Sequence, residues 1–277
     1  MHAALELHDF WNHSVECETM VDTPDESLVD WRLLRRRIVV LTIVVIVLVA
    51  FYGVWQFHAA GVHDKQLAHE IEALGGEVGF HFAGPEWAPQ SVRDNAHFLD
   101  VVDKVDLSGQ EVAADVLLKV ARLNQLVELN LDRTHLTDDQ LELISSMRSL
   151  RRLSLNDTQV TDAGLIHLAQ MSGLELLDLR HDAITDAGLT HLVRLDRLRE
   201  LVLGDTQITD AGLIVLESLT SLESLDLRHT NVTDAGLEHL SSLSGLKQLY
   251  LTHSDVTAEG RAALRQKLTG CAITPNR

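Results

Sequence analysis

The chain has 277 residues, and its 41 acidic side chains against 23 lysines and arginines give a formal net charge of −18 at pH 7. Binding to nucleic acid requires a basic footprint, so this balance argues against DNA or RNA as a partner. Two cysteines, Cys17 and Cys271, provide no disulfide framework.

Residues 1–37 form an acidic N-terminal tail that ends in a cluster of arginines. Residues 1–31 contain eight acidic side chains and no lysine or arginine, and they show no strong hydrophobic period. Such a stretch buries too little apolar surface to fold, so we expect a largely disordered tail. A short partner-binding motif around Phe10 and Trp11 is the alternative for this segment.

Residues 38–57 are predicted to form a transmembrane helix. The stretch Ile38–Trp55 carries no charge and is long enough to span a bilayer, so a lipid bilayer is one expected partner. A cleaved signal peptide is the alternative, but the apolar run is too long for one. The positive-inside rule places the N-terminus in the cytoplasm and the rest of the chain on the other side, the periplasm in a bacterium. The reason is that four arginines precede the span, whereas Lys65 is the only basic residue close after it. These arginines are Arg32, Arg35, Arg36 and Arg37.

Residues 58–101 are interpreted as a linker and a capping segment. Polar and apolar side chains alternate over Glu77–Phe82, which predicts a strand that precedes the repeats. This segment also concentrates aromatic side chains that a cap can bury, namely Phe80, Phe82, Trp87 and Phe98.

Residues 102–277 are predicted to form one domain, organised by a 24-residue unit that repeats about seven times up to Thr269. The first half of each unit alternates apolar and polar residues, which predicts a strand. In the second half leucines recur every three residues, which predicts a short helix. The clearest copies read LxxLxLxxTx(V/I)TDAGLxxLxxLxx, with Asp182 replacing the first Thr in one copy, and begin at Leu150, Leu174, Leu198 and Leu222.

A single unit cannot fold alone, because burying its side chains yields roughly 10–20 kcal/mol while ordering its backbone costs about 25–45 kcal/mol. Stacked units share a core and a parallel sheet. Strands stack closer together than helices, so the predicted fold is an α/β horseshoe with strands inside and helices outside. The degenerate copies Val102–Gln125 and Leu246–Thr269 are its expected ends, and Cys271–Ile273 adds a closing strand.

The helix-start motif has a predicted role for each residue. Thr185 is expected to cap the helix and Asp186 to oppose its dipole. Gly188 costs helix propensity, so we expect it to allow a close approach of backbone at a crowded corner.

The TDAGL repeats resemble the leucine-rich repeat family. They are similar to the repeats of eukaryotic F-box leucine-rich repeat proteins, and more so to those of bacterial membrane-anchored leucine-rich repeat proteins. The resemblance implies a binding surface. Family members usually carry Asn or Cys at the turn after the strand. This chain instead has threonines there, which are expected to form a ladder inside the solenoid: Thr134, Thr158, Thr206 and Thr230.

The concave face is the predicted binding surface for a protein partner. Leu-Asp-Leu-Arg-His occurs twice, with the nearly neutral Val202-Leu203-Gly204 between the copies, and the two rows suit a mixed-charge peptide. The alternative is that repeat duplication copied these residues without selection for binding. The predicted partner-binding residues are Asp178, Arg180, His181, Asp226, Arg228, His229, Tyr250 and His253.

No catalytic, metal or cofactor motif interrupts the repeat, so we predict a non-catalytic protein with no cofactor. The histidine column His181, His229 and His253 is expected to be a solvated edge, because zinc requires three or four converging ligands. The predicted function is protein–protein interaction in the cell envelope by a single-pass membrane protein. The alternatives are a self-associating tether, a ubiquitin-ligase substrate receptor that lacks an F-box, and a hidden hydrolase or metal enzyme.

Overall fold

The computed structural model describes residues 64–82, 90 and 100–274, together with Thr42 and Val45. The chain divides into two units after Val54, and all the described residues except Thr42 and Val45 belong to the second unit. Within the described part, no helix has both the length and the apolar character needed to cross a membrane. The predicted tail and, apart from those two residues, the predicted span 38–57 lie outside the described residues, so both stay predictions.

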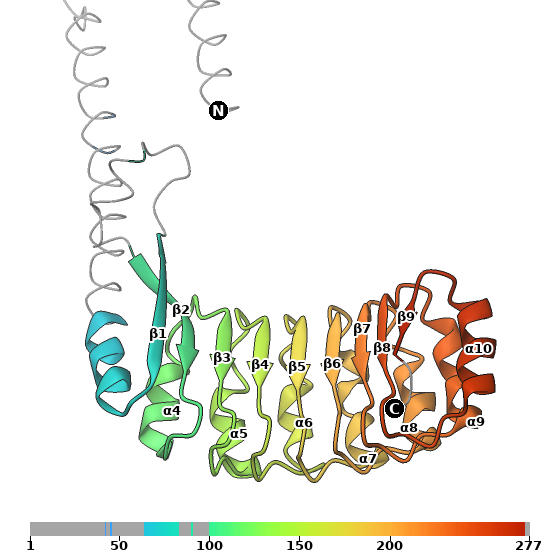
Figure 1. The fold of residues 1–277 in the computed structure, drawn as a ribbon. Coiled ribbons are helices and arrows are strands. Elements are labelled where there is room, and N and C mark those ends of the chain that lie inside the picture. The colour runs from blue at the N-terminus through green and yellow to red at the C-terminus, as the bar shows by residue number, and fades with distance from the viewer. Residues whose placement is uncertain (1–41, 43–44, 46–63, 83–89, 91–99, 275–277) are drawn as a thin grey trace, which may run out of the picture. The chain divides into compact units, whose positions relative to one another are not determined.

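One nine-stranded sheet runs the length of the second unit in sequence order (Figure 1). β1 is antiparallel to β2. Each later strand is parallel to the strand before it, and each of its paired residues lies opposite the residue 24 positions earlier. The predicted strand before the repeats and the predicted closing strand both form, as β1 and β9. The strands are β1 Glu77–Phe82, β2 Asp100–Asp106, β3 Glu128–Asn130, β4 Arg152–Ser154, β5 Leu176–Asp178, β6 Glu200–Val202, β7 Ser224–Asp226, β8 Gln248–Tyr250 and β9 Ala272–Ile273.

Short helices cover the other side of the sheet (Figure 1). Leu189, Leu192 and Leu195 are fully buried, and the chain follows their spacing of three by passing from an α-helix into a 3₁₀ helix, in which such residues share one side. The helices are α4 Ala114–Val120, α5 Asp138–Ile144, α6 Leu165–Leu168, α7 Asp186–Leu189, η2 Leu192–Arg194, α8 Asp210–Leu216, α9 Asp234–Leu237, η3 His239–Ser242 and α10 Ala258–Lys267.

The hydrophobic core is one cluster that continues through every repeat, between the sheet and the helices. At its N-terminal end, residues 64–73 are helical and insert Leu67 and Ile71 into the cluster. This segment therefore covers apolar surface that the first repeat would otherwise expose. The side of the sheet that points away from the helices is called the concave face below.

A ladder of aspartate and threonine side chains, the Asp–Thr ladder, joins the helix starts of successive repeats. Asp186 Oδ1 accepts a hydrogen bond from Thr209 N at 2.9 Å, and Asp186 Oδ2 accepts one from Thr209 Oγ1 at 2.6 Å. The predicted capping role of Thr185 is confirmed, because its side chain accepts from Ala187 N. The five rungs join Asp138 to Thr161, Asp162 to Thr185, Asp186 to Thr209, Asp210 to Thr233 and Asp234 to Thr257.

Each rung requires a glycine in the helix that it reaches. A Cβ on Gly212 would overlap the Asp186 carboxylate, and the same holds for the glycine of every other rung. The prediction that Gly188 lies close to backbone is therefore wrong. The group that crowds Gly188 is the Asp162 side chain of the preceding repeat. The glycine of the motif is therefore needed to leave space for an aspartate carboxylate.

At Thr137 both the aspartate and the glycine of a rung are replaced by other residues. Thr137 has Ala114 one repeat below it instead of an aspartate, and its helix carries Gln140 where later helices carry glycine. The Gln140 side chain occupies this space and accepts a hydrogen bond from Thr137 N at 3.1 Å. A capping box within one repeat thus replaces the missing rung.

The predicted threonine ladder forms at Thr134, Thr206 and Thr230, whose buried hydroxyls donate to carbonyl oxygens three residues earlier at 2.5–2.7 Å. Thr158 differs, because its N and Oγ1 donate to Asp182 Oδ1 at 2.8 and 2.9 Å. Asp182 is 4% exposed, and its Oδ2 has no hydrogen-bond partner among the described residues. Burial raises the pKa of Asp182 to about 7.

The last repeat carries arginines that satisfy carbonyl groups at the end of the stack. Arg261 stands where the other repeats have a core leucine, and its Nη1 donates to Val256 O at 2.9 Å. In interior repeats the corresponding carbonyl accepts from the backbone of the next repeat. Arg265 Nη2 donates to Ile273 O of β9 at 2.8 Å. Residues that replace the motif after Thr257 thus bond to carbonyl groups in the last repeat and in β9.

Replacing Gly212 by alanine is expected to destabilise the fold by about 1–3 kcal/mol, although alanine is the better helix former, because its Cβ displaces the Asp186 carboxylate. In an Asp186→Ala background the same change should be neutral or stabilising by up to about 1 kcal/mol. Urea unfolding of the four proteins of this double-mutant cycle measures both values. An equal cost in the two backgrounds would show that the glycine serves another purpose.

Replacing Asp182 by threonine is expected to increase stability more at pH 8 than at pH 5. The folded-state pKa lies above the unfolded value, so between pH 4 and 7 the unfolded chain releases a proton that the folded chain keeps, and stability falls as pH rises. The pH-dependent part of the difference should be on the order of 2 kcal/mol. Urea unfolding at both pH values measures it, with Thr206→Ser as the control that changes no charge. A pH-independent difference would contradict this assignment.

Candidate functional site

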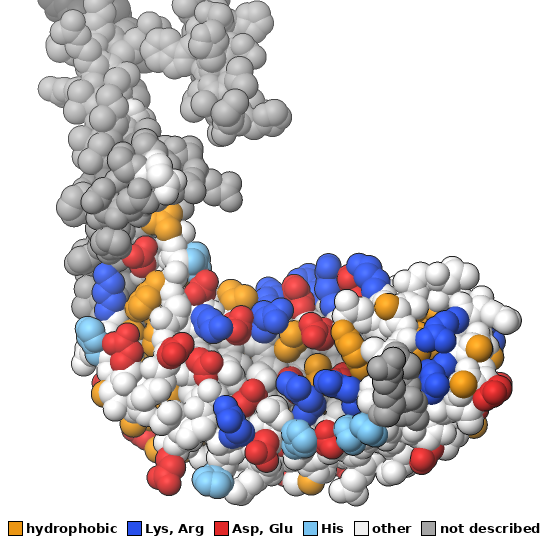
Figure 2. Space-filling view, viewed as in Figure 1, with side chains coloured by type: hydrophobic (Ala, Val, Ile, Leu, Met, Phe, Trp, Pro, Cys, Tyr) orange, Lys and Arg blue, Asp and Glu red, His pale blue; other side chains and the backbone are white. Residues whose placement is uncertain are grey.

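The predicted binding residues lie together on the concave face over β5–β8. The strand register places Asp178, Val202, Asp226 and Tyr250 side by side across four strands. Figure 2 shows lysine and arginine side chains gathered over these strands, with histidines along the edge below them. The repeat therefore brings residues that lie far apart in the sequence onto one surface.

Two arginines form the most ordered part of this surface. Arg180 donates from Nε and Nη2 to the Asp178 carboxylate at 2.6–3.1 Å, and Arg228 makes the same bonds to Asp226 at 2.5–2.9 Å. Hydrogen bonding to these carboxylates raises the pKa of both arginines. The guanidinium groups are thus held in fixed orientations as permanent cations.

The aspartates of the two pairs do not face a partner directly. The Asp178 and Asp226 side chains are only 8% and 5% exposed, whereas those of Arg180 and Arg228 are 37% and 42% exposed. Each carboxylate also accepts from the backbone N–H of its own arginine. The sequence predicts these aspartates as binding residues, and the structure places them beneath the arginines, whose positions they fix.

Tyr250 extends the site on one side. The Arg228 guanidinium carbon lies 5.6 Å from the centre of the Tyr250 ring, within the range of a cation–π interaction. The Tyr250 hydroxyl donates to Gln248 Oε1 at 2.8 Å. The aromatic ring therefore helps to orient Arg228 while it adds apolar surface.

The histidine column forms the edge of the concave face at the turn after each strand. His229 and His253 stack with ring centres 4.4 Å apart, and Asp205 lies 3.8 Å from His181 Nε2 and 4.0 Å from His229 Nδ1. Residues in this column have φ between 53° and 61°, a left-handed conformation in which Asp and His are enriched. The backbone requirement thus explains much of the column, and the described residues hold no group of three His, Cys, Asp or Glu side chains arranged for a metal ion.

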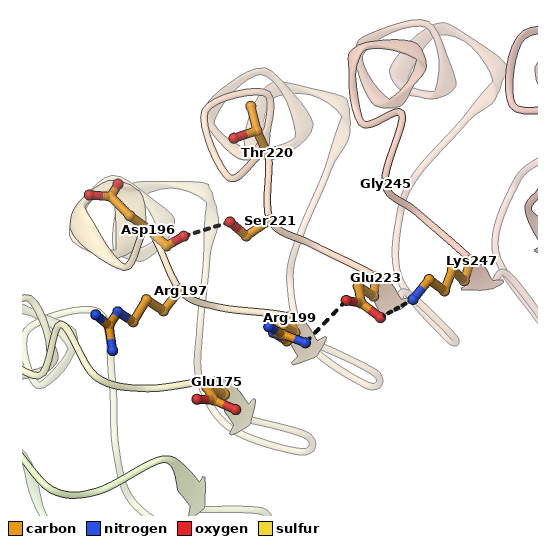
Figure 3. A pocket seen from close by; sticks show the side chains of 9 residues that line it. All are labelled: Glu175, Asp196, Arg197, Arg199, Thr220, Ser221, Glu223, Gly245 and Lys247. Carbon is orange, nitrogen blue, oxygen red and sulfur yellow. Dashed lines mark hydrogen bonds and ion pairs between the residues drawn. The ribbon is translucent and has the colours of Figure 1, made fainter. Parts of the chain in front are cut away.

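A second polar site was not anticipated from the sequence. A hollow of about 500 Å³ opens near the N-terminal ends of the strands (Figure 3). Glu223 lines this hollow and forms ion pairs with Arg199 Nη1 at 3.4 Å and Lys247 Nζ at 2.5 Å. The signal was present, because the second residue of successive repeats alternates in charge: Arg151, Glu175, Arg199, Glu223 and Lys247. These charges largely satisfy one another at an exposed edge, so this hollow is a weaker candidate than the arginine pairs.

Comparison with known proteins agrees with this architecture. Residues 187–256 and 146–169 match two family models described as leucine rich repeat. No curated protein sequence matches the chain. Among solved structures, internalin C2 of Listeria monocytogenes has a TM-score of 0.52 at 22% identity, over 62% of this chain and 80% of that one.

Two further structures show weaker likeness. A leucine-rich repeat protein of Leptospira interrogans has a TM-score of 0.45 at 22% identity, over 57% of this chain and 39% of that one. A second Listeria monocytogenes internalin (inlF) has a TM-score of 0.38 at 21% identity, over 58% of each chain. At such identities structural likeness concerns the fold alone. The matched repeat models and the parallel solenoid together identify the chain as a leucine-rich repeat protein.

Proposed function

We propose that this protein is a non-catalytic binding protein whose concave face holds a protein partner over β5–β8. The observation that carries the proposal is the pair of half-exposed arginines, Arg180 and Arg228, each anchored on a buried carboxylate. Binding to a pre-oriented guanidinium costs less side-chain entropy than binding to a free one. Leucine-rich repeat domains are generally interaction modules, and solenoids use their extended concave surfaces for binding.

We also propose that the protein is anchored in a membrane through residues 38–57 and presents the repeats on the non-cytoplasmic side of the cell envelope. The uncharged stretch Ile38–Trp55 and the arginines before it support this arrangement. Anchoring would concentrate the concave face at one surface, where even a modest affinity suffices for capture.

The anchor is expected to stay in the mature protein. The chain isolated from membranes should keep its tail, resist extraction at high pH, and expose its repeats to protease only from the non-cytoplasmic side. N-terminal sequencing distinguishes this from secretion, because a mature chain that starts near Gly61 would rule out the anchor.

A photo-crosslinking amino acid at Val202 is expected to capture the partner in cells, whereas the same group at Ile214, which is 54% exposed on α8, should not. Replacing both arginines and their carboxylates together (Asp178→Asn, Arg180→Gln, Asp226→Asn and Arg228→Gln) leaves no buried charge unpaired. This variant should keep its thermal unfolding midpoint within a few degrees and bind the captured protein at least 10-fold more weakly in titrations. Unchanged affinity, or equal capture from Ile214, would contradict concave-face binding.

A further inference from the structure

We infer that the concave face over β5–β7 recognises an extended polypeptide segment with two carboxylate side chains three residues apart. This inference rests on the proposed function and names the chemistry of the partner. Arg180 and Arg228 each take one carboxylate, and the segment between them crosses the bare backbone of Gly204.

The first support is the near-symmetry of the surface about β6. The strand β5 and its turn carry Asp178, Arg180 and His181, while β7 and its turn repeat the same three residue types in the same register. The strand between them has Val202 and Gly204 instead. Two equal cationic side chains, Arg180 and Arg228 (the arms), therefore flank the small residues Val202 and Gly204 (the floor).

The second support is the direction in which each guanidinium remains free. The bonds to Asp178 and Asp226 use Nε and Nη2, so within the described part of the chain Nη1 of each arginine donates no hydrogen bond. A carboxylate accepts strongly from such an N–H, because both partners carry charge. The half-exposed arginines thus keep donors for a ligand while their buried carboxylates fix their positions.

The third support is that nothing in the fold requires Gly204. A Cβ there would have its nearest neighbours at 3.4–3.6 Å, which is ordinary contact, whereas a Cβ at the ladder glycines would overlap a carboxylate. Nor does Gly204 have a positive φ. All six other repeats have a side chain in this column: Ser108, Asp132, Asn156, Arg180, Arg228 and Thr252. The missing side chain at Gly204 opens the floor between the arginines.

The spacing of the two arms selects the ligand geometry. Neighbouring strands lie about 4.8 Å apart, so arms on β5 and β7 are separated by about 10 Å. In a polyproline II segment three residues make one turn and each advances the chain by about 3.1 Å, so side chains three positions apart lie on the same side and span a similar distance. The segment therefore runs across the strands, along the axis of the solenoid.

Neighbouring charges restrict where such a segment can cross. Glu200 lies on β6 and Asp205 lies in the turn after it, so carboxylates are disfavoured at both ends of the floor. His181 Nε2 and His229 Nδ1 lie 3.8 and 4.0 Å from the Asp205 carboxylate. The wider negative charge of the protein is screened within about 8 Å at physiological ionic strength. Acidic side chains are therefore favoured locally at the arms.

Synthetic peptides test this directly on the purified full chain in detergent. The probe Ac-Ala-Glu-Ala-Ala-Glu-Ala-NH₂ should bind at least 10-fold more tightly, by calorimetry or NMR titration, than the same peptide with two glutamines. It should also bind at least 5-fold more tightly than a peptide with adjacent glutamates. Equal binding of the three peptides, or no binding of the first at millimolar concentration, would overturn the inference.

Gly204→Val is expected to reduce binding of the two-glutamate peptide at least 10-fold, and Gly204→Ala about 3-fold, with unchanged thermal unfolding of the alanine variant. Gly245→Ala is the matched control, because its Cβ would also meet neighbours at 3.4–3.5 Å but lies at the other hollow. Arg180→Lys with Arg228→Lys keeps the charges and should still weaken binding about 5-fold. Full affinity in both Gly204 variants would overturn the inference.

The two proposals fail in different ways. If Val202 captures a partner in cells and the peptides show no preference for spaced carboxylates, concave-face binding stands and the acidic-segment inference is wrong. If Val202 captures nothing while the spaced peptide binds selectively, the surface has the inferred chemistry but the proposed cellular partner is not held there.

Discussion

The bond between the aspartate of one repeat and the threonine of the next is the constraint on which the stack depends. Asp186 completes the helix start of the following repeat, so a repeat that receives such a bond does not satisfy its own backbone groups alone. The same carboxylate excludes a Cβ at Gly212. Aspartate, threonine and glycine thus form one unit that spans two repeats. Where that unit is absent, at the first threonine cap, Gln140 supplies the missing acceptor from within its own repeat.

What the sequence predicts well lies within a single repeat. The alternation of strand residues, the leucine spacing and the cap at Thr185 depend on neighbours a few positions away, so all of them were predictable. The partner of Gly188 lies in the preceding repeat, and the pattern alone does not tell a crowding carboxylate from a crowding backbone. The same holds for Asp182, whose bonds reach back 24 positions to Thr158. Contacts between repeats require the register of the stack.

The candidate site divides in the same way. Arg180 and Arg228 were visible as repeated residues, but the burial of Asp178 and Asp226 beneath them was not, because it depends on how each arginine folds back over its own strand. The histidines carry less weight as evidence of binding, since a positive φ already favours their column. The arginine column has no such backbone requirement. Its variation is therefore the better indication of a surface adapted to a ligand.

Copying of repeats does not by itself give the arrangement of this surface. Duplication of one repeat would place its copy next to it, yet the two Asp-Arg-His rows are separated by the strand that carries Val202 and Gly204. Duplication of a pair of repeats would place the same valine and glycine again one repeat after Arg228. That repeat instead has Tyr250, whose ring packs against Arg228, and Thr252. The threonine and glycine of the Asp–Thr ladder recur in all of these repeats while the concave positions differ, which is the pattern expected when the ladder holds the fold and the concave face is left to recognise a partner.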